Sequence, residues 1–176
     1  MIETERLEIK PWLESQTQDF FNLTQDNGFN LHLITIYRQT DHASALNWIR
    51  TSIQLYNETR LGKWGVWEKS TGSLIGIGGL TPWQYNNENL VDITYRLRET
   101  AWGKGYGLEI AKALCDHAFQ KLNLSEITAT VTPDNAASKK ILEKLGMKFD
   151  RRILLLDVET DLFRLKKADF SLPRWQ

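Results

Sequence analysis

The chain is poor in cysteine and proline, and it carries no net charge. Its one cysteine, Cys115, can form neither an intramolecular disulfide nor a cysteine-rich zinc site, which fits a reducing compartment. Basic and acidic residues both number 22, so bulk charge does not attract the chain to nucleic acid or to anionic membranes. The longest apolar run, Leu74 to Leu80, is far shorter than the roughly 18 residues of a membrane span. These absences predict a cytoplasmic protein without a structural metal and without nucleic-acid or membrane partners.

The composition is that of an ordinary globular domain. The chain has 176 residues, 41% of them apolar, and its four prolines are isolated from one another. No repeat, low-complexity tract or linker interrupts it, so a single domain over residues 1–176 is expected. Seven Trp, seven Phe and five Tyr supply rings for a core and for the walls of a cleft.

Apolar periodicity predicts alternating blocks of strand and helix. Alternation at every second residue predicts seven strands, near residues 6–10, 63–69, 73–80, 90–97, 127–131, 147–156 and 160–166. Helical spacing predicts helices near residues 15–25, 41–56, 107–122 and 135–145. Ser70-Thr71-Gly72 predicts a hairpin turn, and Asn27-Gly28 is predicted to end the first helix. The order favours an α+β fold in which helices flank a mixed, mostly antiparallel sheet of about seven strands.

A glycine-rich segment, Trp102-Gly103-Lys104-Gly105-Tyr106-Gly107, joins a predicted strand to a predicted helix. Backbone N–H groups at a helix N-terminus bind phosphate, and glycines let the anion approach closely. A P-loop is excluded because Gly105, not Ser or Thr, follows Lys104. The Gly-x-Gly-x-Gly spacing from Gly103 also fits a dinucleotide fingerprint poorly.

Several motifs in one order resemble the GCN5-related N-acetyltransferase (GNAT) superfamily, and most closely its ribosomal-protein N-acetyltransferase-like branch. They are the strand Asp92 to Leu97, the glycine-rich segment with Leu108-Glu109, Asn135-Ala136-Ala137-Ser138, and Glu143-Lys144-Leu145-Gly146-Met147. The resemblance covers nearly the whole chain. It implies a sheet splayed at an acyl-CoA site, acetyl-CoA as acyl donor and no metal.

The resemblance also assigns residues to the cofactor. It implies that the loop residues Gly103, Lys104, Gly105, Tyr106 and Gly107 bind the pyrophosphate, with Trp102 in place of the family's Gln or Arg. Main-chain groups of Tyr95, Arg96 and Leu97 would pair with pantetheine and polarise the thioester carbonyl. Asn135 matches the family asparagine that contacts the cofactor.

The catalytic predictions are Ser138 and Asp92. Ser138 lies one helical turn after Asn135 and is expected to hydrogen-bond the departing sulfur, whereas a solvent-facing serine is the structural alternative. Leu142 occupies the position of the tyrosine acid of many family members, so that acid is absent there. Asp92 could accept the amine proton through water, or could be an ordinary strand acid in an enzyme that only positions a neutral amine. His32, His42 and His117 share no spacing and are expected at the surface or in caps.

Two function classes remain open. The first is an acetyl-CoA-dependent N-acetyltransferase that acts by direct attack on a primary amine, either a protein N-terminus such as that of a ribosomal protein or a small molecule. The second is a CoA-binding sensor with the same fold and no turnover. A homodimer is expected by resemblance. The acidic surplus of residues 1–60 favours a cationic acceptor, and the basic surplus of residues 121–176 favours the phosphates of CoA.

Overall fold

A single eight-stranded sheet organises the molecule, and the computed structural model describes residues 1–33 and 37–170. The strand order is β1-β2-β3-β4-β5-β6-β8-β7, and every neighbouring pair is antiparallel except β5 and β6. The bounds are β1 Ile2–Glu3, β2 Leu7–Lys10, β3 Gly62–Glu68, β4 Ser73–Tyr85, β5 Glu88–Leu97, β6 Glu126–Val131, β7 Lys148–Leu155 and β8 Val158–Lys166. The predicted α+β class is confirmed. The eighth strand, β1, has two residues, too few to show an alternating pattern.

Strands β4 and β5 are longer than their patterns predicted. The predicted Ser70 to Gly72 turn does join β3 to β4, but β4 continues through Pro82 to Tyr85. Proline fits there because β3 pairs with β4 only as far as Leu80, so the missing N–H of Pro82 breaks no bond to β3. Asn86 and Asn87, with φ of 46° and 66°, then form a two-residue turn into β5.

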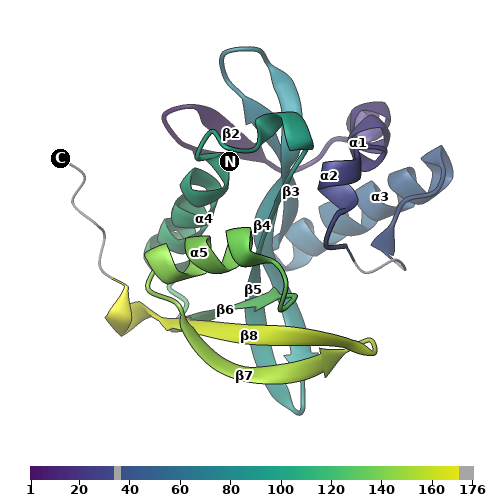
Figure 1. The fold of residues 1–176 in the computed structure, drawn as a ribbon. Helices are drawn as coiled ribbons and strands as arrows, with labels where there is room; N and C mark the ends of the chain where they lie inside the picture. The colour runs from purple at the N-terminus through teal and green to yellow at the C-terminus, as the bar shows by residue number, and fades with distance from the viewer. Residues whose placement is uncertain (34–36, 171–176) are drawn as a thin grey trace.

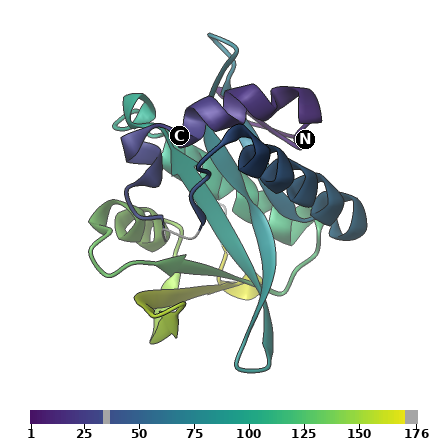
Figure 2. The same ribbon diagram turned by 90° about the vertical axis from the view of Figure 1, so that its right-hand side faces the viewer.

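Helices cover both faces of the sheet (Figures 1 and 2). On one side lie α1 (Thr17–Thr24), α2 (Asn27–Asn30) and α3 (His42–Thr59). On the other lie α4 (Tyr106–Asp116), which continues as a π-helical turn to Lys121, and α5 (Ala136–Lys144). One apolar core fills each interface. Among the described residues, no helix has the length and apolar character needed to cross a membrane.

The sequence did not predict α2. Asn27-Gly28 was expected to end a helix, but Asp26 accepts a hydrogen bond from the Phe29 N–H and starts a new turn. The same Asp26 oxygen also accepts from the Glu99 N–H at 3.1 Å, which fixes α2 at the end of β5. A Cβ at Gly28 would lie 2.7 Å from the Glu99 Cβ, so only glycine permits this approach.

Strands β5 and β6 separate soon after they meet. Their parallel pairing consists of Asp92 opposite Thr128, while β5 pairs with β4 along its whole length. Main-chain groups of Tyr95 to Leu97 on the β6 side therefore have no strand partner, as predicted.

Cys115 is fully buried on α4, and burial raises the pKa of its thiol to about 12, so it is a structural residue.

Candidate active site

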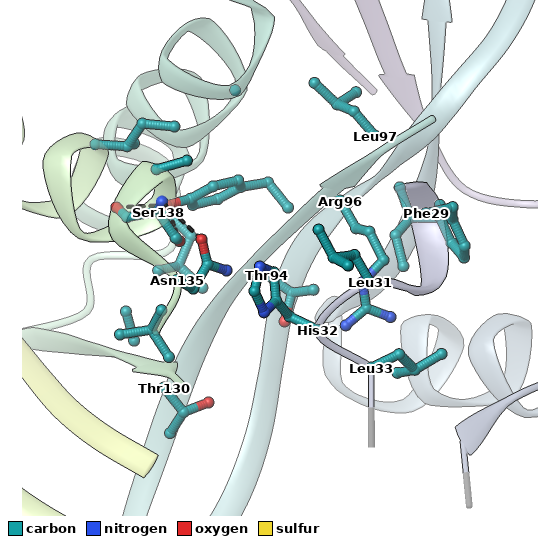
Figure 3. A pocket seen from close by; sticks show the side chains of 18 of the residues that line it. Phe29, Leu31, His32, Leu33, Thr94, Arg96, Leu97, Thr130, Asn135 and Ser138 are labelled. Carbon is teal, nitrogen blue, oxygen red and sulfur yellow. Dashed lines mark hydrogen bonds between the residues drawn. The ribbon is translucent and has the colours of Figure 1, made fainter. Parts of the chain in front are cut away.

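A cleft of about 750 Å³ opens where β5 and β6 separate. Its size is that of a small-molecule or cofactor site. The glycine-rich loop and α5 line one part of it, and α2, β3, β4 and the opposite face of β5 line the other. Figure 3 shows Asn135 and Ser138 on one side of β5, and Phe29 and Arg96 on the other.

The glycine-rich loop leads into α4 with its backbone open to solvent. Gly103 and Gly105 have φ of 73° and 80°, a region that costs side-chain-bearing residues about 1 kcal/mol. A Cβ at Gly103 would meet nothing within 4 Å, so space for a ligand exists above it. Gly105 is the N-cap of α4 and no side chain caps this end, so the first N–H groups of the helix are available to an anion.

The other three residues predicted to bind the pyrophosphate do not all line the cleft. Trp102 lines the cleft, and its indole N–H donates to the Leu97 carbonyl at 3.0 Å, which ties the loop to the end of β5. The ring of Tyr106 is buried, and its hydroxyl donates to Glu68 on β3. Lys104 is exposed and is not among the residues that line the cleft. Charge from the Lys104 side chain is therefore absent from the cleft wall.

An N-terminal brace, formed by Thr4 and Arg6, holds this loop. Arg6 donates to the Lys104 carbonyl at 2.9 Å and to Glu109 Oε2 at 2.8 Å, and Thr4 donates to Glu109 Oε1. Burial alone would raise the pKa of Glu109, but these hydrogen bonds lower it below its usual value. The contacts join residues about a hundred positions apart, a distance over which no local pattern predicts pairing.

Asn135, Ser138 and Tyr95 meet on the α5 side of β5. Asn135 caps α5 by accepting a hydrogen bond from the Ser138 N–H at 3.0 Å. The Ser138 hydroxyl lies 2.8 Å from the Tyr95 hydroxyl, and either oxygen can donate (Figure 3). Burial raises the pKa of Tyr95 far above its usual range, so the phenol stays protonated.

The Tyr95 side chain was missed because only its main chain had been assigned. Alternation along β5 could have revealed it, since Ile93, Tyr95 and Leu97 share the face that packs on α4 and α5. Leu142, in the position where many relatives carry tyrosine, is buried in the core. The hydroxyl of Tyr95 therefore reaches Ser138 from the strand instead of from the helix.

Asp92 also lines the cleft, at the point where β5 and β6 part. Its carboxylate accepts hydrogen bonds from the hydroxyls of Thr128 at 2.8 Å and Thr130 at 2.9 Å. Burial raises the pKa of Asp92, and the threonine hydroxyls oppose that shift. A carboxylate with a raised pKa is a better proton acceptor than an exposed one.

Arg96 and His32 lie on the other side of β5, near α2. Arg96 had been assigned through its main chain, yet its guanidinium extends toward α2, 5.5 Å from the Phe29 ring centre. His32 was expected at the surface or in a cap, but it is half-buried and lines the cleft, with Nδ1 3.4 Å from the Thr132 hydroxyl.

Within residues 1–33 and 37–170, no three His, Cys, Asp or Glu side chains gather as a metal site.

Known proteins are similar to this chain in sequence. The family model for the acetyltransferase (GNAT) domain matches residues 6–148. The uncharacterized N-acetyltransferase p20 of Bacillus licheniformis is 33% identical over 126 residues, which cover 72% of this chain and 69% of p20. The uncharacterized protein YkkB of Bacillus subtilis is 31% identical over 108 residues, and the chain spans 61% of its length.

A solved structure extends the match to the fold. RimL, a ribosomal L7/L12 α-N-protein acetyltransferase solved with coenzyme A, superposes with a TM-score of 0.79 at 16% identity, over 93% of this chain and 95% of RimL. The chain therefore belongs to the GNAT acetyltransferase family. Its fold is that of GNAT acetyltransferases, RimL among them.

Proposed function

We propose that this protein is an acetyl-CoA-dependent N-acetyltransferase that moves an acetyl group to a primary amine by direct attack in a ternary complex. One observation carries the proposal: the uncapped N-terminus of α4, the unpaired edge of β5 and the Tyr95–Ser138 pair all border one cleft. These groups can bind the pyrophosphate of acetyl-CoA, its pantetheine arm and its thioester. A cytoplasmic location belongs to the same proposal, supported by the free, buried Cys115.

The chain offers a distinct contact for each part of the donor. The N–H groups at Gly103, Gly105 and Gly107 would hold the pyrophosphate. Main-chain groups along Tyr95, Arg96 and Leu97 at the β5 edge that faces β6 would pair with pantetheine and orient the thioester carbonyl, and the Asn135 amide would contact the cofactor beside them. Trp102 and Tyr106 would contribute by anchoring the loop, and Lys104 would contribute through its backbone, which Arg6 holds.

Proton transfer would use two sites on opposite sides of the thioester. Acetyl-CoA supplies an electrophilic carbonyl carbon whose C–S bond breaks as the amine forms the C–N bond. Asp92 would take the proton that the amine loses, through a water molecule. Ser138 would donate its hydroxyl proton to the departing sulfur and regain one from Tyr95, and water would reprotonate Tyr95 as Asp92 releases the amine proton to solvent.

Binding of the donor is the first test. Isothermal calorimetry should show acetyl-CoA and CoA binding to the full chain, and absence of binding at millimolar concentration would refute the proposal. The sensor alternative predicts binding without release of thiol for any amine. The pairing of Tyr95 with Ser138 and the buried carboxyl of Asp92 favour turnover instead.

The acceptor class is the finer part of the proposal. RimL acts on a ribosomal protein, which supports a protein N-terminus as acceptor, and a small amine is the other candidate. Mass spectrometry after incubation with N-terminal peptides and with small amines separates the two.

A homodimer is also proposed, because the edge strand β7 exposes Phe149 and Leu154; sedimentation that shows only a monomer would contradict it.

A further inference from the structure

The side of the cleft opposite Ser138 holds two basic side chains, Lys63 and Arg96. Lys63 on β3 lies opposite Gly79 on β4, and Gly79 lies opposite Thr94 on β5, so the three form one row across the sheet. Arg96 is two residues beyond Thr94 on the same face, and both cations line the cleft. Gly79 must be glycine, because a Cβ there would lie 1.9 Å from the Gly62 carbonyl oxygen. The backbone of β3 therefore packs directly against Gly79 beside Lys63.

Neither cation has a carboxylate in direct contact on the described chain, although Asp92 attracts the Lys63 ammonium from a longer distance. Lys63 and Arg96 form no ion pair and no side-chain hydrogen bond with any residue in 1–33 or 37–170, and Arg96 only faces the ring of Phe29. Burial lowers the pKa of Lys63, and it lowers the pKa of Arg96 to about 10. Desolvated charge without a partner is costly, and a bound anion would offset that cost.

The remaining charges leave this region positive. Asp92 is the one carboxylate among the described residues that line the cleft, and two threonine hydroxyls already bond it. The residues of 1–33 and 37–60 that line the cleft include no acidic side chain. The N-terminal acidic surplus therefore lies elsewhere, and the expectation that it favours a cationic acceptor does not apply at the cleft. Thr81 adds a buried hydroxyl oxygen without a partner on the described chain.

Apolar side chains border the two cations. Phe29 from α2 and Trp48 from α3 line the cleft, and so do Leu31 and Leu33, which Figure 3 shows on the same side of β5 as Arg96. Guanidinium and ammonium groups in such surroundings bind carboxylate or phosphate with charge-assisted hydrogen bonds. The apolar walls would contact the carbon skeleton of the same ligand.

We infer that Lys63 and Arg96 form an oxyanion subsite for the acceptor, and that the acceptor is a small amine that also carries a carboxylate or phosphate group. This inference rests on the proposed acetyltransferase function. It places the amine near Asp92 and Thr94 and the oxyanion toward Arg96 along β5. Free amino acids belong to this substrate class, whereas simple alkylamines do not.

Matched amines test the substrate class. Thiol release from acetyl-CoA is measured with phenylalanine against phenethylamine, and with phosphoethanolamine against ethanolamine, where each pair differs by the oxyanion. We expect kcat/KM to be at least about tenfold higher for the oxyanion member of one pair, the scale of one charge-assisted contact. The favoured pair identifies carboxylate or phosphate as the natural group. Equal values within both pairs would overturn the inference.

Variants test the residues. Arg96→Gln and Lys63→Gln should raise KM for the favoured amine about tenfold, while the Kd of CoA stays unchanged and shows that the fold is intact. Arg50→Gln on α3, which breaks an exposed ion pair with Glu14, is the control and should change neither quantity. An unchanged KM in both cleft variants would contradict the subsite.

A measurement without turnover separates this inference from the proposed function. Binding of 3-phenylpropionate and of ethyl phosphate, which have the carboxylate or the phosphate but no amine, is followed by NMR titration of the CoA complex. If binding of either ligand requires Lys63 and Arg96 but no amine is acetylated, the subsite stands and the acetyltransferase proposal falls. If neither ligand binds, or if each ligand that binds does so equally to wild type and both variants, the subsite is refuted whatever the activity.

Discussion

The hydroxyl groups of Tyr95 and Ser138, 2.8 Å apart, are the smallest unit on which the chemistry depends. Neither position alone signals a proton path, since tyrosine is common in strands and serine is common near helix starts. The path exists because β5 and α5 place the two oxygens in contact beside the separated strands. A raised pKa keeps the phenol protonated throughout the range in which an amine is a nucleophile.

Removing one hydroxyl tests this path. Tyr95→Phe should lower kcat by roughly ten- to a hundredfold because the leaving sulfur loses its proton supply, while the Kd of CoA changes little. Ser138→Ala should have a similar effect, and the double variant should be no worse than either single one. Tyr56→Phe, on α3 against Trp64, is the control. Additive losses would show that the two hydroxyls act independently.

The pH dependence of kcat/KM tests Asp92. Because burial raises its pKa, the carboxyl becomes protonated at a higher pH than an ordinary aspartate of pKa about 3.9, and activity should fall below that raised pKa. Thr130→Val removes a hydrogen bond that lowers this pKa, so the acidic limb should move to higher pH. Asp92→Asn should lower the rate and abolish the limb. A profile unchanged in both variants would exclude Asp92 as the base.

At the scale of elements, the loop before α4 combines a conformation that requires glycine with an open helix terminus. Its position depends on the brace from Arg6 and on the bond from Trp102 to β5. The segment from Trp102 to Gly107 was predictable because glycine spacing is a local signal. The brace was not, because Arg6 and Glu109 come together only when β2 packs beside α4.

A matched pair of glycines tests the loop. Gly103 and Gly72 have φ of 73° and 68°, and a Cβ at either would meet nothing within 4 Å. Alanine should therefore destabilise the fold equally at both positions, by about 1 kcal/mol. Only Gly103→Ala should weaken CoA binding, as measured by calorimetry. Equal CoA affinity in the two variants would remove the loop from the phosphate site.

The attachment of α5 to β8 is a second test at this scale. Asp161, nearly fully buried, accepts hydrogen bonds from Arg152 at 2.8 Å and from Lys139 of α5 at 2.7 Å. These contacts lower its pKa, so the stability they contribute is present above the unfolded pKa and is lost as pH falls through the lower folded value.

Asp161→Asn should lower the free energy of unfolding by about 2 kcal/mol at pH 7, the scale of hydrogen bonds to a charged group. The difference from wild type should shrink in acid, which urea unfolding at several pH values measures. Asp157→Asn, in the turn between β7 and β8, is the control. A constant difference across pH would contradict this account of Asp161.

At the scale of the whole molecule, what the sequence predicted depended on how local the signal was. Alternation located the strands, the helices predicted from residues 41 and 135 do begin there, and the order of motifs indicated the splayed sheet. The short α2 was missed because Asp26 reads as part of a turn until its contact with Glu99 is seen. Lys63 and Arg96 were missed as a pair because they approach through sheet register, which no spacing in the chain reports.

The central claim is that one cleft binds acetyl-CoA beside an amine and transfers the acetyl group between them. The most direct measurement is stoichiometric release of CoA thiol with mass-spectrometric detection of the acetylated amine, using both amine pairs and N-terminal peptides. We predict thiol release only when an amine is present, equal in amount to acetylated product, and lost in Tyr95→Phe and Asp92→Asn. Tight binding of acetyl-CoA with no thiol release for any of these amines would contradict the claim and identify a CoA sensor instead.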